Sequence, residues 1–255
     1  MAEKRYLLAE MTWPEVKKAL ETVEVAVIPV GANEQHGPHL ATSCDAVRAY
    51  EFSKLLAERM FPKVLVTPPV NFGISYHHLC FPGTISLHPQ TLISIIKDIV
   101  KSLKTYGIKK FFILNSHGGN DTTLDVACTI IEQEVEGVKV GFVKYTSLAK
   151  ESIQKHVKSP DYGHSCEREV SEILYLKPEI FKPDALAKGD LKTHPCRHTS
   201  ANRGPIGLPY EFNLRTGNGC LGDATKASRE IGKEICDEAL EKLAEFLDDF
   251  IRLEM

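Results

Sequence analysis

The chain has 255 residues, of which 43% are hydrophobic and 25% are charged, and this composition predicts one globular α/β domain spanning residues 1–255. Its formal net charge of -3 at pH 7 is too weak to recruit nucleic acid or an anionic membrane surface, so the expected partner is a small-molecule substrate. The seven cysteines form no C-x-x-C pair and no run approaches the roughly 18 apolar residues of a membrane span, which argues against a disulfide framework and indicates a protein of the reducing cytoplasm.

Strand, loop and helix alternate in the first part of the chain. A β-branched run over residues 25–30 (VAVIPV) predicts a buried strand, and apolar residues at near-helical spacing predict a helix over 45–60. The order then repeats as a strand over 64–70 (VLVTPPV), a loop over 71–87 and a helix over 89–106.

The alternation continues toward the C-terminus. Residues 193–223 are rich in glycine, proline, asparagine and arginine, which predicts a long irregular segment of the kind that carries function or subunit contacts. The regular elements expected in this part are strands over 111–114 and 138–143 and helices over 122–134, 147–157 and 224–253.

This order of elements predicts a doubly wound α/β fold, with a mostly parallel sheet and helices on both faces. Parallel strands require crossover connections, and those connections are right-handed helices. The loops that follow the strands then lie at one edge of the sheet, where ligands bind in open α/β folds. We therefore expect the segments 31–45, 71–88 and 115–121 to meet in space.

The first of these segments reads GANEQHGPHLATSCD and contains Glu34, His36, His39 and Asp45, all of which can bind a metal. Glu34 and His36 are two residues apart, so in an extended loop they point to opposite sides and reach two different ions. Asp45 is the bridging candidate, because a carboxylate can join two cations about 3.5–4 Å apart. The alternative is that Glu34 is a solvated loop acid, His36 a loop donor and Asp45 a helix cap.

The second segment, NSHGGND, places His117 after a predicted strand and follows it with Gly118 and Gly119. Glycines allow backbone amides or a ligand to approach closely, and the start of a helix favours an anion. The alternative is a simple turn between a strand and a helix.

A third cluster, GHSCEREVSE, contains His164, Glu167 and Glu169 before an apolar helix. If this stretch is helical, His164 and Glu167 share a face as two metal ligands or an acid/base pair would. The alternative is an acidic first turn that complements the helix dipole.

The loop SYHHLCFPGTISLH adds Ser75, His77, His78 and His88, which either shape a substrate pocket or satisfy buried carbonyls. Three loops, each at a predicted strand end on the same sheet edge, thus carry histidine together with glutamate or aspartate. Oxygen and imidazole ligands without cysteine suit zinc, manganese or iron(II).

Taken together, VIPVGANEQHGPHLATSCD, HHLCFPGTISL, LNSHGGND, HSCEREVSEIL and GCLGDATKAS resemble the creatininase family of metal-dependent hydrolases, over about residues 25 to 230. The resemblance implies a doubly wound α/β fold, two divalent metal ions per chain and hydrolysis of an amide, often a cyclic amide or a formamide. It also implies a homo-oligomer, which is a hexamer in the creatinine-cleaving member.

The resemblance also implies roles for individual residues. Glu34, Asp45 and His117 are similar to the ligands of one metal, and His36 with the shared Asp45 to those of the other. The creatinine-cleaving enzymes have a further glutamate ligand where this chain has Gly119, so a substitute is expected in HSCERE.

Within HSCERE, Glu167 is favoured over Glu169 as that substitute ligand. His164 resembles the acid/base histidine of the family, with Asp161 to orient it or contact substrate and Glu169 as a further catalytic candidate. Ser75, His78, Gly118 and Gly119 are the candidates for substrate contact.

The predicted reaction is the hydrolysis of a small cyclic amide or a formamide. A hydroxide between two divalent ions attacks the carbonyl, and His164 passes a proton to the leaving nitrogen. The alternatives are the opening of a cyclic polyol ketone by carbon–carbon hydrolysis and a metal-binding relative without activity. Arg197, His198, Arg203 and Arg215 in the late irregular segment are candidates for reading an acidic substrate group or for subunit contacts.

Overall fold

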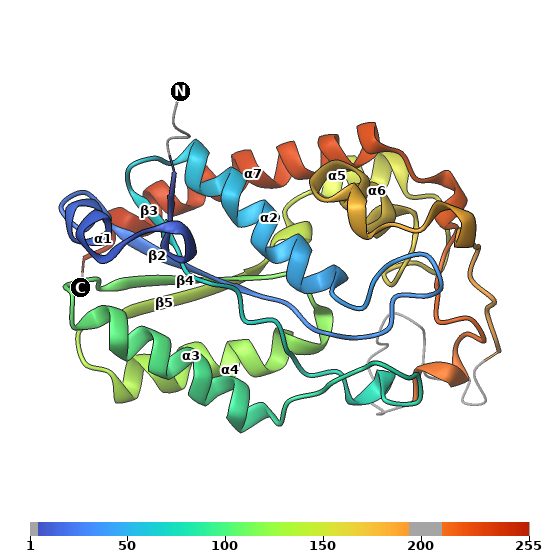
Figure 1. The fold of residues 1–255 in the computed structure, drawn as a ribbon, viewed down its shortest axis with the longest axis horizontal. Coiled ribbons are helices and arrows are strands. Elements are labelled where there is room, and N and C mark those ends of the chain that lie inside the picture. Colours follow the sequence, from blue (N-terminus) through green and yellow to red (C-terminus); the bar gives the residue numbers. More distant parts are fainter. Residues whose placement is uncertain (1–4, 194–210, 255) are drawn as a thin grey trace.

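A five-stranded sheet, in which every pair of neighbouring strands is parallel, forms the centre of the structure (Figure 1). The structure is a computed structural model and describes residues 5–193 and 211–254. The order of strands across the sheet is β1-β3-β2-β4-β5. The strands are β1 (Tyr6–Leu7), β2 (Val25–Val30), β3 (Val64–Val66), β4 (Lys110–Asn115) and β5 (Lys139–Lys144).

Helices cover both faces of the sheet. In Figure 1, α3 and α4 lie below it, and α2 and α7 lie above it with α5 and α6. The predicted doubly wound α/β fold is confirmed. Among the described residues, no helix combines the length and apolarity that crossing a bilayer requires. The helices are α1 (Trp13–Ala19), α2 (Cys44–Arg59), α3 (Pro89–Lys104), α4 (Asp121–Glu134), α5 (Lys150–His156), α6 (Glu167–Leu176) and α7 (Arg229–Arg252).

The two faces of β2 contribute to two different cores. Val25 and Val27 pack in the cluster formed with α2 and α7, whereas Ala26 and Ile28 pack in the cluster formed with α3 and α4. Successive side chains of a strand point to opposite faces, so a strand covered on both sides reads as a continuous apolar run. The sequence VAVIPV therefore indicates a central strand of the sheet.

Several predicted boundaries shift in the structure. The strand expected over 64–70 ends at Val66, because Pro68 and Pro69 have no N–H to donate to a neighbouring strand. The helix expected over 224–253 begins at Arg229, where the Ser228 side chain accepts a hydrogen bond from the Ile231 N–H at 3.2 Å. The two-residue strand β1 carries too short a pattern to be predicted.

The carboxyl ends of β2 and β4 lie side by side, because Val30 pairs in register with Asn115. The two loops that follow these strands therefore start as neighbours. The N-terminal end of α2 packs tightly against the first loop at Gly31, where an added Cβ would lie 2.3 Å from the Ala46 nitrogen. Only glycine permits this approach, which carries Asp45 to the edge of the sheet.

Candidate metal centre

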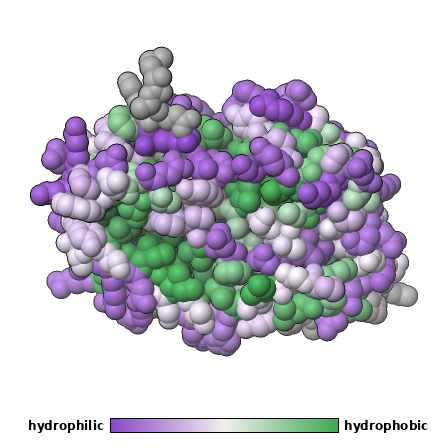
Figure 2. Space-filling model, in the orientation of Figure 1, coloured by the Kyte–Doolittle hydropathy of each residue, from purple (hydrophilic) through white to green (hydrophobic). Residues whose placement is uncertain are grey.

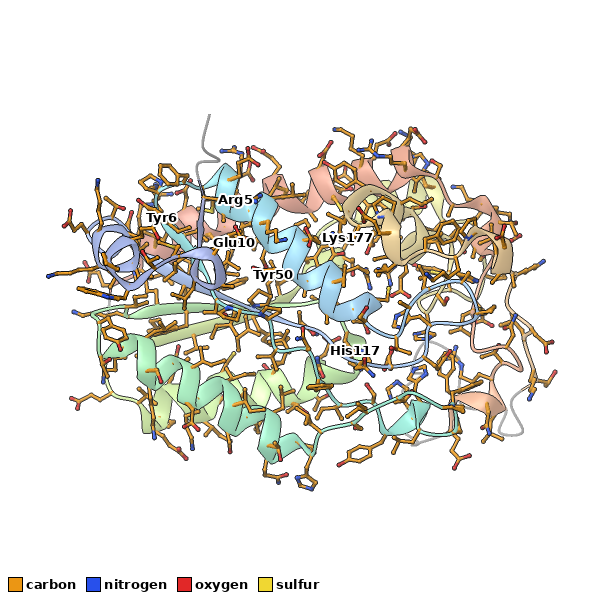
Figure 3. All side chains as sticks on the ribbon, viewed as in Figure 1. Arg5, Tyr6, Glu10, Tyr50, His117 and Lys177 are labelled. Carbon is orange, nitrogen blue, oxygen red and sulfur yellow. The ribbon has the colours of Figure 1, made fainter. Side chains whose placement is uncertain are left out.

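Glu34, Asp45 and His117 meet at the carboxyl end of the sheet. Figure 3 shows His117 beyond the end of β4 and close to the start of α2. Its Nδ1 lies 3.3 Å from Glu34 Oε1 and 3.1 Å from Asp45 Oδ2. All three side chains are at least 95% buried. The interpretation of Glu34 as a solvated loop acid is therefore wrong.

A second set forms around His36. Its Nε2 lies 3.5 Å from Asp45 Oδ1 and 3.6 Å from Glu169 Oε2. Asp45 thus presents one oxygen to His36 and the other to His117. This is the arrangement that the sequence predicted for a carboxylate shared between two cations.

Three buried polar atoms in these sets, Glu34 Oε2, His36 Nε2 and Asp45 Oδ2, make no well-directed hydrogen bond among the described residues, although His117 Nδ1 lies 3.1 Å from Asp45 Oδ2. Buried polar atoms are almost always hydrogen-bonded, so atoms of this kind fit a site for an ion or a water. The other nitrogen of each imidazole is engaged, since His36 Nδ1 lies 3.1 Å from the Glu34 carbonyl and His117 Nε2 lies 3.0 Å from the Ile74 carbonyl. Backbone partners of this type orient metal-binding histidines, so the residues fit two cations.

The charges of these groups are matched to one another. Burial alone would raise the pKa of Glu34, but the imidazoles of His117 and His78 outweigh it, and the pKa lies below its ordinary value. Burial likewise opposes ionisation of Asp45, and His36 with His117 still holds its pKa well below the ordinary value. Glu34 and Asp45 in turn hold the pKa of His117 well above its ordinary value despite burial, whereas burial lowers the pKa of His78. A cation bound between these acids and His117 would displace the proton of His117.

His164 and His78 both face the same oxygen of Glu34. His164 Nδ1 and His78 Nε2 are each 3.5 Å from Glu34 Oε1. Burial, followed by the charge of His36, lowers the pKa of His164 to about 4. The ring of Phe212 covers both imidazoles, with centroid distances of 4.1 Å to His78 and 4.8 Å to His164.

The hydrogen bonds of Gln35 fix the tautomer of His164. The Gln35 amide nitrogen lies 2.9 Å from His78 Nδ1, 3.0 Å from His164 Nε2 and 3.1 Å from the Gly219 carbonyl. Because a carbonyl oxygen can only accept, His164 Nε2 donates to the Gln35 backbone carbonyl at 2.7 Å. His164 Nδ1 is left as the acceptor that faces Glu34.

Glu167 lies outside this cluster. Its two oxygens accept hydrogen bonds from the backbone nitrogens of Ser159 at 3.1 Å and Asp223 at 2.9 Å. The prediction that His164 and Glu167 share a helix face is wrong, because α6 begins at Glu167 and the preceding Ser165 has φ 50. The left-handed turn separates His164 from the helix, and Glu169 takes the place beside His36 that was expected for Glu167.

The other predicted residues divide between the cluster and its surroundings. The Ser75 hydroxyl is buried 3.5 Å from His117 Nε2. An added Cβ at Gly119 would lie 2.3 Å from the same nitrogen, whereas one at Gly118 would meet only Lys144, at 3.8 Å. Gly119 therefore leaves room for the His117 ring, and position 118 is open.

Asp161 and His39 do not join the cluster. Within residues 5–193 and 211–254, no hydrogen bond or ion pair connects the Asp161 carboxylate with His164. His39 Nε2 lies 3.0 Å from the Ser165 carbonyl, which accounts for its burial. Arg215 lies beside Phe212, with its guanidinium carbon 5.6 Å from the ring centroid. Arg197, His198 and Arg203 lie outside the described residues.

Sequence reasoning missed Gln35, Phe212 and Arg48. Arg48 lies one helical turn after Asp45, and its Nη1 is 3.0 Å from Asp45 Oδ1. The spacing of an acid and an arginine at i and i+3 on a predicted helix was the available signal. Phe212 had no such signal, because it lies in a segment without periodicity.

Comparison with known proteins assigns the family. The family model described as Creatininase: Creatinine amidohydrolase matches residues 9–247. The chain belongs to the creatininase family. It is accordingly a creatininase-family hydrolase.

Relatives of this creatininase-family chain act on different compounds, as their names state. The mycofactocin precursor peptide peptidase of Mycobacterium ulcerans (strain Agy99) is 28% identical over 91% of this chain and 86% of its own length. The creatinine amidohydrolase of Pseudomonas putida is 26% identical over 95% of this chain and 96% of its own. The 3-dehydro-scyllo-inosose hydrolase of Thermotoga maritima (strain ATCC 43589 / DSM 3109 / JCM 10099 / NBRC 100826 / MSB8) is 25% identical over 95% of this chain and 81% of its own.

Solved creatininase structures share this fold. One creatinine amidohydrolase (creatininase) matches with a TM-score of 0.85 at 25% identity, covering 98% of this chain and 100% of that one. A structure named Creatininase Mn and a mutant creatininase of Zn-Zn type each match with a TM-score of 0.83 at 25% identity. They cover 98% and 97% of this chain and 100% and 98% of their own. The creatininase family therefore includes manganese and zinc forms. The described residues of this chain include groups that could hold an ion, among them Glu34 with His78 and His164, His36 with His164 and Glu169, and His36 with Asp45 and the thiol of Cys44.

Proposed function

We propose that the chain is a metal-dependent amidohydrolase that acts on a small cyclic amide or a formamide. The observation that carries this proposal is Asp45, whose two oxygens face two separate sets of buried ligand atoms, 3.5 Å from His36 Nε2 and 3.1 Å from His117 Nδ1. Manganese or zinc is favoured by the solved creatininases, and iron(II) is compatible with the same donor atoms.

Each residue of the site has a proposed role toward the two cations. Glu34, Asp45 and His117 would hold one ion, and His36, Asp45 and Glu169 the other. Two divalent cations in such a site polarise a carbonyl and make water nucleophilic near neutral pH. Glu169 replaces Glu167 as the additional ligand, because Glu169 Oε2 lies 3.6 Å from His36 Nε2, whereas both oxygens of Glu167 accept from backbone N–H groups away from the cluster.

His164 is the proposed acid/base residue. With its pKa lowered to about 4, the imidazole is neutral at pH 7 and can accept a proton. The bond from Nε2 to the Gln35 carbonyl leaves Nδ1 as the accepting nitrogen, and Nδ1 is the atom that faces the metal ligand Glu34. Proton transfer from attacking water to the leaving nitrogen would pass through this atom.

The test is a substrate panel assayed with the metal-loaded protein. The panel contains five- and six-membered lactams, formamides, a short linear peptide and cyclic polyol ketones. The proposal expects turnover of a lactam or a formamide, which frees an amine group and a carboxylate or formate, and no turnover after chelation. Cleavage of the linear peptide alone would contradict it. Opening of the ketones alone would contradict an amidohydrolase and establish the carbon–carbon alternative, which the similarity to the Thermotoga maritima hydrolase favours.

A variant of His164 tests its role separately from folding. His164→Asn should lower kcat by about 10²- to 10⁴-fold, the usual contribution of general acid–base catalysis. The metal content should remain that of the unmodified protein. Loss of bound metal in this variant would instead make His164 a ligand.

For the unmodified protein, two bound equivalents of metal without turnover of any panel member would support a metal-binding relative without activity.

We also infer that the chain is a single domain over residues 1–255, works in the cytoplasm and forms a homo-oligomer, a hexamer by family resemblance. An apolar groove supports the oligomer, since Phe72, Ile95 and Ile99 line it together with Pro68 and Pro69. Figure 2 shows apolar side chains gathered over α3 and the segment after β3. Light scattering after size-exclusion chromatography should report a molar mass of several chains of 28.4 kDa, and of six for a hexamer. A monomer at micromolar concentration would contradict this inference.

A further inference from the structure

A closed set of buried charges lies behind the metal centre. Its members are three acids, Asp45, Glu169 and Glu172, and two arginines, Arg48 and Arg168. Arg48 contacts all three acids, and Arg168 lies 3.0 Å from Glu169 Oε1 and 3.0 Å from Glu172 Oε1. Every side chain in the set is at least 90% buried. The set joins α2 to α6 and includes two of the proposed cation ligands.

The guanidinium of Arg48 divides its contacts between its two ends. Nη1 lies 3.0 Å from Asp45 Oδ1 and 3.0 Å from Glu169 Oε1. Nε donates to Glu172 Oε2 at 2.5 Å, and the Tyr145 hydroxyl donates to the same oxygen at 2.8 Å. Because a guanidinium is a rigid plane, its two ends cannot move independently. Glu172 and Tyr145 therefore fix Arg48, and Arg48 fixes the two acids.

Net stability does not account for this set. Burying five charges carries a desolvation cost that offsets most of their attraction, and apolar replacements of buried ion pairs are often neutral or stabilising. The placement of the acids does account for it. The oxygen Glu169 Oε1 is held by the guanidinium groups of Arg48 and Arg168. Its other oxygen, Oε2, accepts from the Ser165 N–H at 2.6 Å and faces His36 Nε2 at 3.6 Å.

We infer that Arg48 is a positioning residue of the metal centre, which fixes the separation of Asp45 and Glu169 and so the fit of the cation beside His36. One nitrogen of its rigid guanidinium group, Nη1, contacts both acids. The inference rests on the proposed function, because it requires cations at these ligands. It concerns geometry and not charge alone, since a point charge in the same place could not hold both acids and Glu172 together.

Arg48→Lys tests the inference, because lysine keeps the positive charge and loses the fork. The metal-free full-length protein is titrated with Zn²⁺ and separately with Mn²⁺ by calorimetry, and the absorption spectrum of the Co²⁺-loaded protein reports ligand geometry. One of the two equivalents should bind about 10- to 100-fold more weakly, the usual cost of losing an outer partner of metal ligands. The Co²⁺ spectrum should change as well. Arg59→Lys is the matched control, since it makes the same substitution at the exposed end of the same helix, where Arg59 pairs with Glu241, and it should bind both equivalents as the unmodified protein does.

A second variant keeps the test decisive if Arg48→Lys folds poorly. The double variant Arg48→Met/Glu172→Leu removes a buried cation and a buried acid together, which buried sites tolerate better than the loss of one partner. It should show the same direction of weakening at an unchanged unfolding temperature. Either folded variant binding both equivalents with unmodified affinity and spectrum would overturn the inference, and so would tighter binding. Failure of the unmodified protein to bind two equivalents would instead overturn the proposed function.

Discussion

The α3–α4 layer and the α2–α6 pair use burial in opposite ways. Between α3, α4 and the sheet, the buried side chains are apolar, as with Leu92, Ile96 and Val100. Between α2 and α6, several side chains as deeply buried are charged, as with Arg48 and Glu172, beside apolar ones such as Ile173. The first layer gains free energy by removing apolar surface from water. The α2–α6 pair loses the solvation of its ions and gains a fixed arrangement of ligand groups. The α3–α4 layer therefore stabilises the fold, whereas the α2–α6 pair positions the groups proposed to perform chemistry.

The largest expected effect is at the shared acid. Asp45→Ala removes one ligand from each proposed cation, and the loss of the Lewis acid at the reacting group is worth several kcal/mol, or about 10³-fold or more in kcat/KM. Turnover and elemental analysis of the bound metal should both fall. Circular dichroism checks that the variant is folded, because Asp45 is also a partner of the buried Arg48. A folded variant with full turnover would refute the role of Asp45.

The apolar layer should respond in the reverse manner. Ile96→Ala leaves a cavity against the sheet and should lower the free energy of unfolding by about 2–5 kcal/mol in urea titrations. The affinity for metal should not change. Thr91→Ala on the exposed side of the same helix is the control, with an expected change within about 0.5 kcal/mol. If folded Ile96→Ala lost affinity for metal, the apolar layer and the metal centre would not be independent of one another.

The two glycines after His117 should differ from one another. Gly119→Ala places a Cβ 2.3 Å from His117 Nε2 and 2.3 Å from the Ile74 carbonyl oxygen, so the imidazole must move. Metal affinity should fall about tenfold or more, as for other disturbed ligand orientations. Gly118→Ala meets only Lys144, at 3.8 Å, and should bind metal normally. Equal affinities in calorimetric titrations of the two variants would show that this crowding does not hold His117 in place.

The smallest expected effect concerns a surface acid far from the metal centre. Burial alone would raise the pKa of Glu238, but Lys242 and the Ser152 N–H, 2.7 Å from Oε2, lower it to about 2. A carboxyl with a lowered pKa stabilises the fold above its ordinary pKa of 4.5, and this contribution disappears as the pH falls through about 2.

Glu238→Gln should therefore lower the free energy of unfolding by up to about 1 kcal/mol at pH 7 and by less at pH 3. Glu245→Gln, on the exposed side of the same helix, should change neither value. Urea unfolding at the two pH values is the measurement. A difference that grows toward low pH would contradict the assigned sign.

The sequence predicted those features that depend on local patterns. Apolar runs and helical spacing located β2, β4 and the layer of α3 and α4. The position of loops after parallel strands predicted that the acids Glu34 and Asp45 would meet His117. Period and strand polarity are properties of the chain alone, so these features need no knowledge of distant contacts.

The identity of the additional ligand could not be predicted in this way. Whether Glu167 or Glu169 faces His36 depends on where α6 begins, and a left-handed residue at Ser165 sets that start. Ser165 has no propensity signal for a positive φ, which is uncommon outside glycine, asparagine and aspartate. Pairing of acids and arginines between α2 and α6 is equally invisible, since it joins side chains more than 100 positions apart.

Anomalous diffraction from crystals loaded with Zn²⁺ or Mn²⁺ would show whether Asp45 is shared between two cations. We expect two cations per chain, with Asp45 shared between them, Glu34 and His117 completing one site and His36 and Glu169 the other. A single cation, or two cations without Asp45 between them, would contradict this expectation.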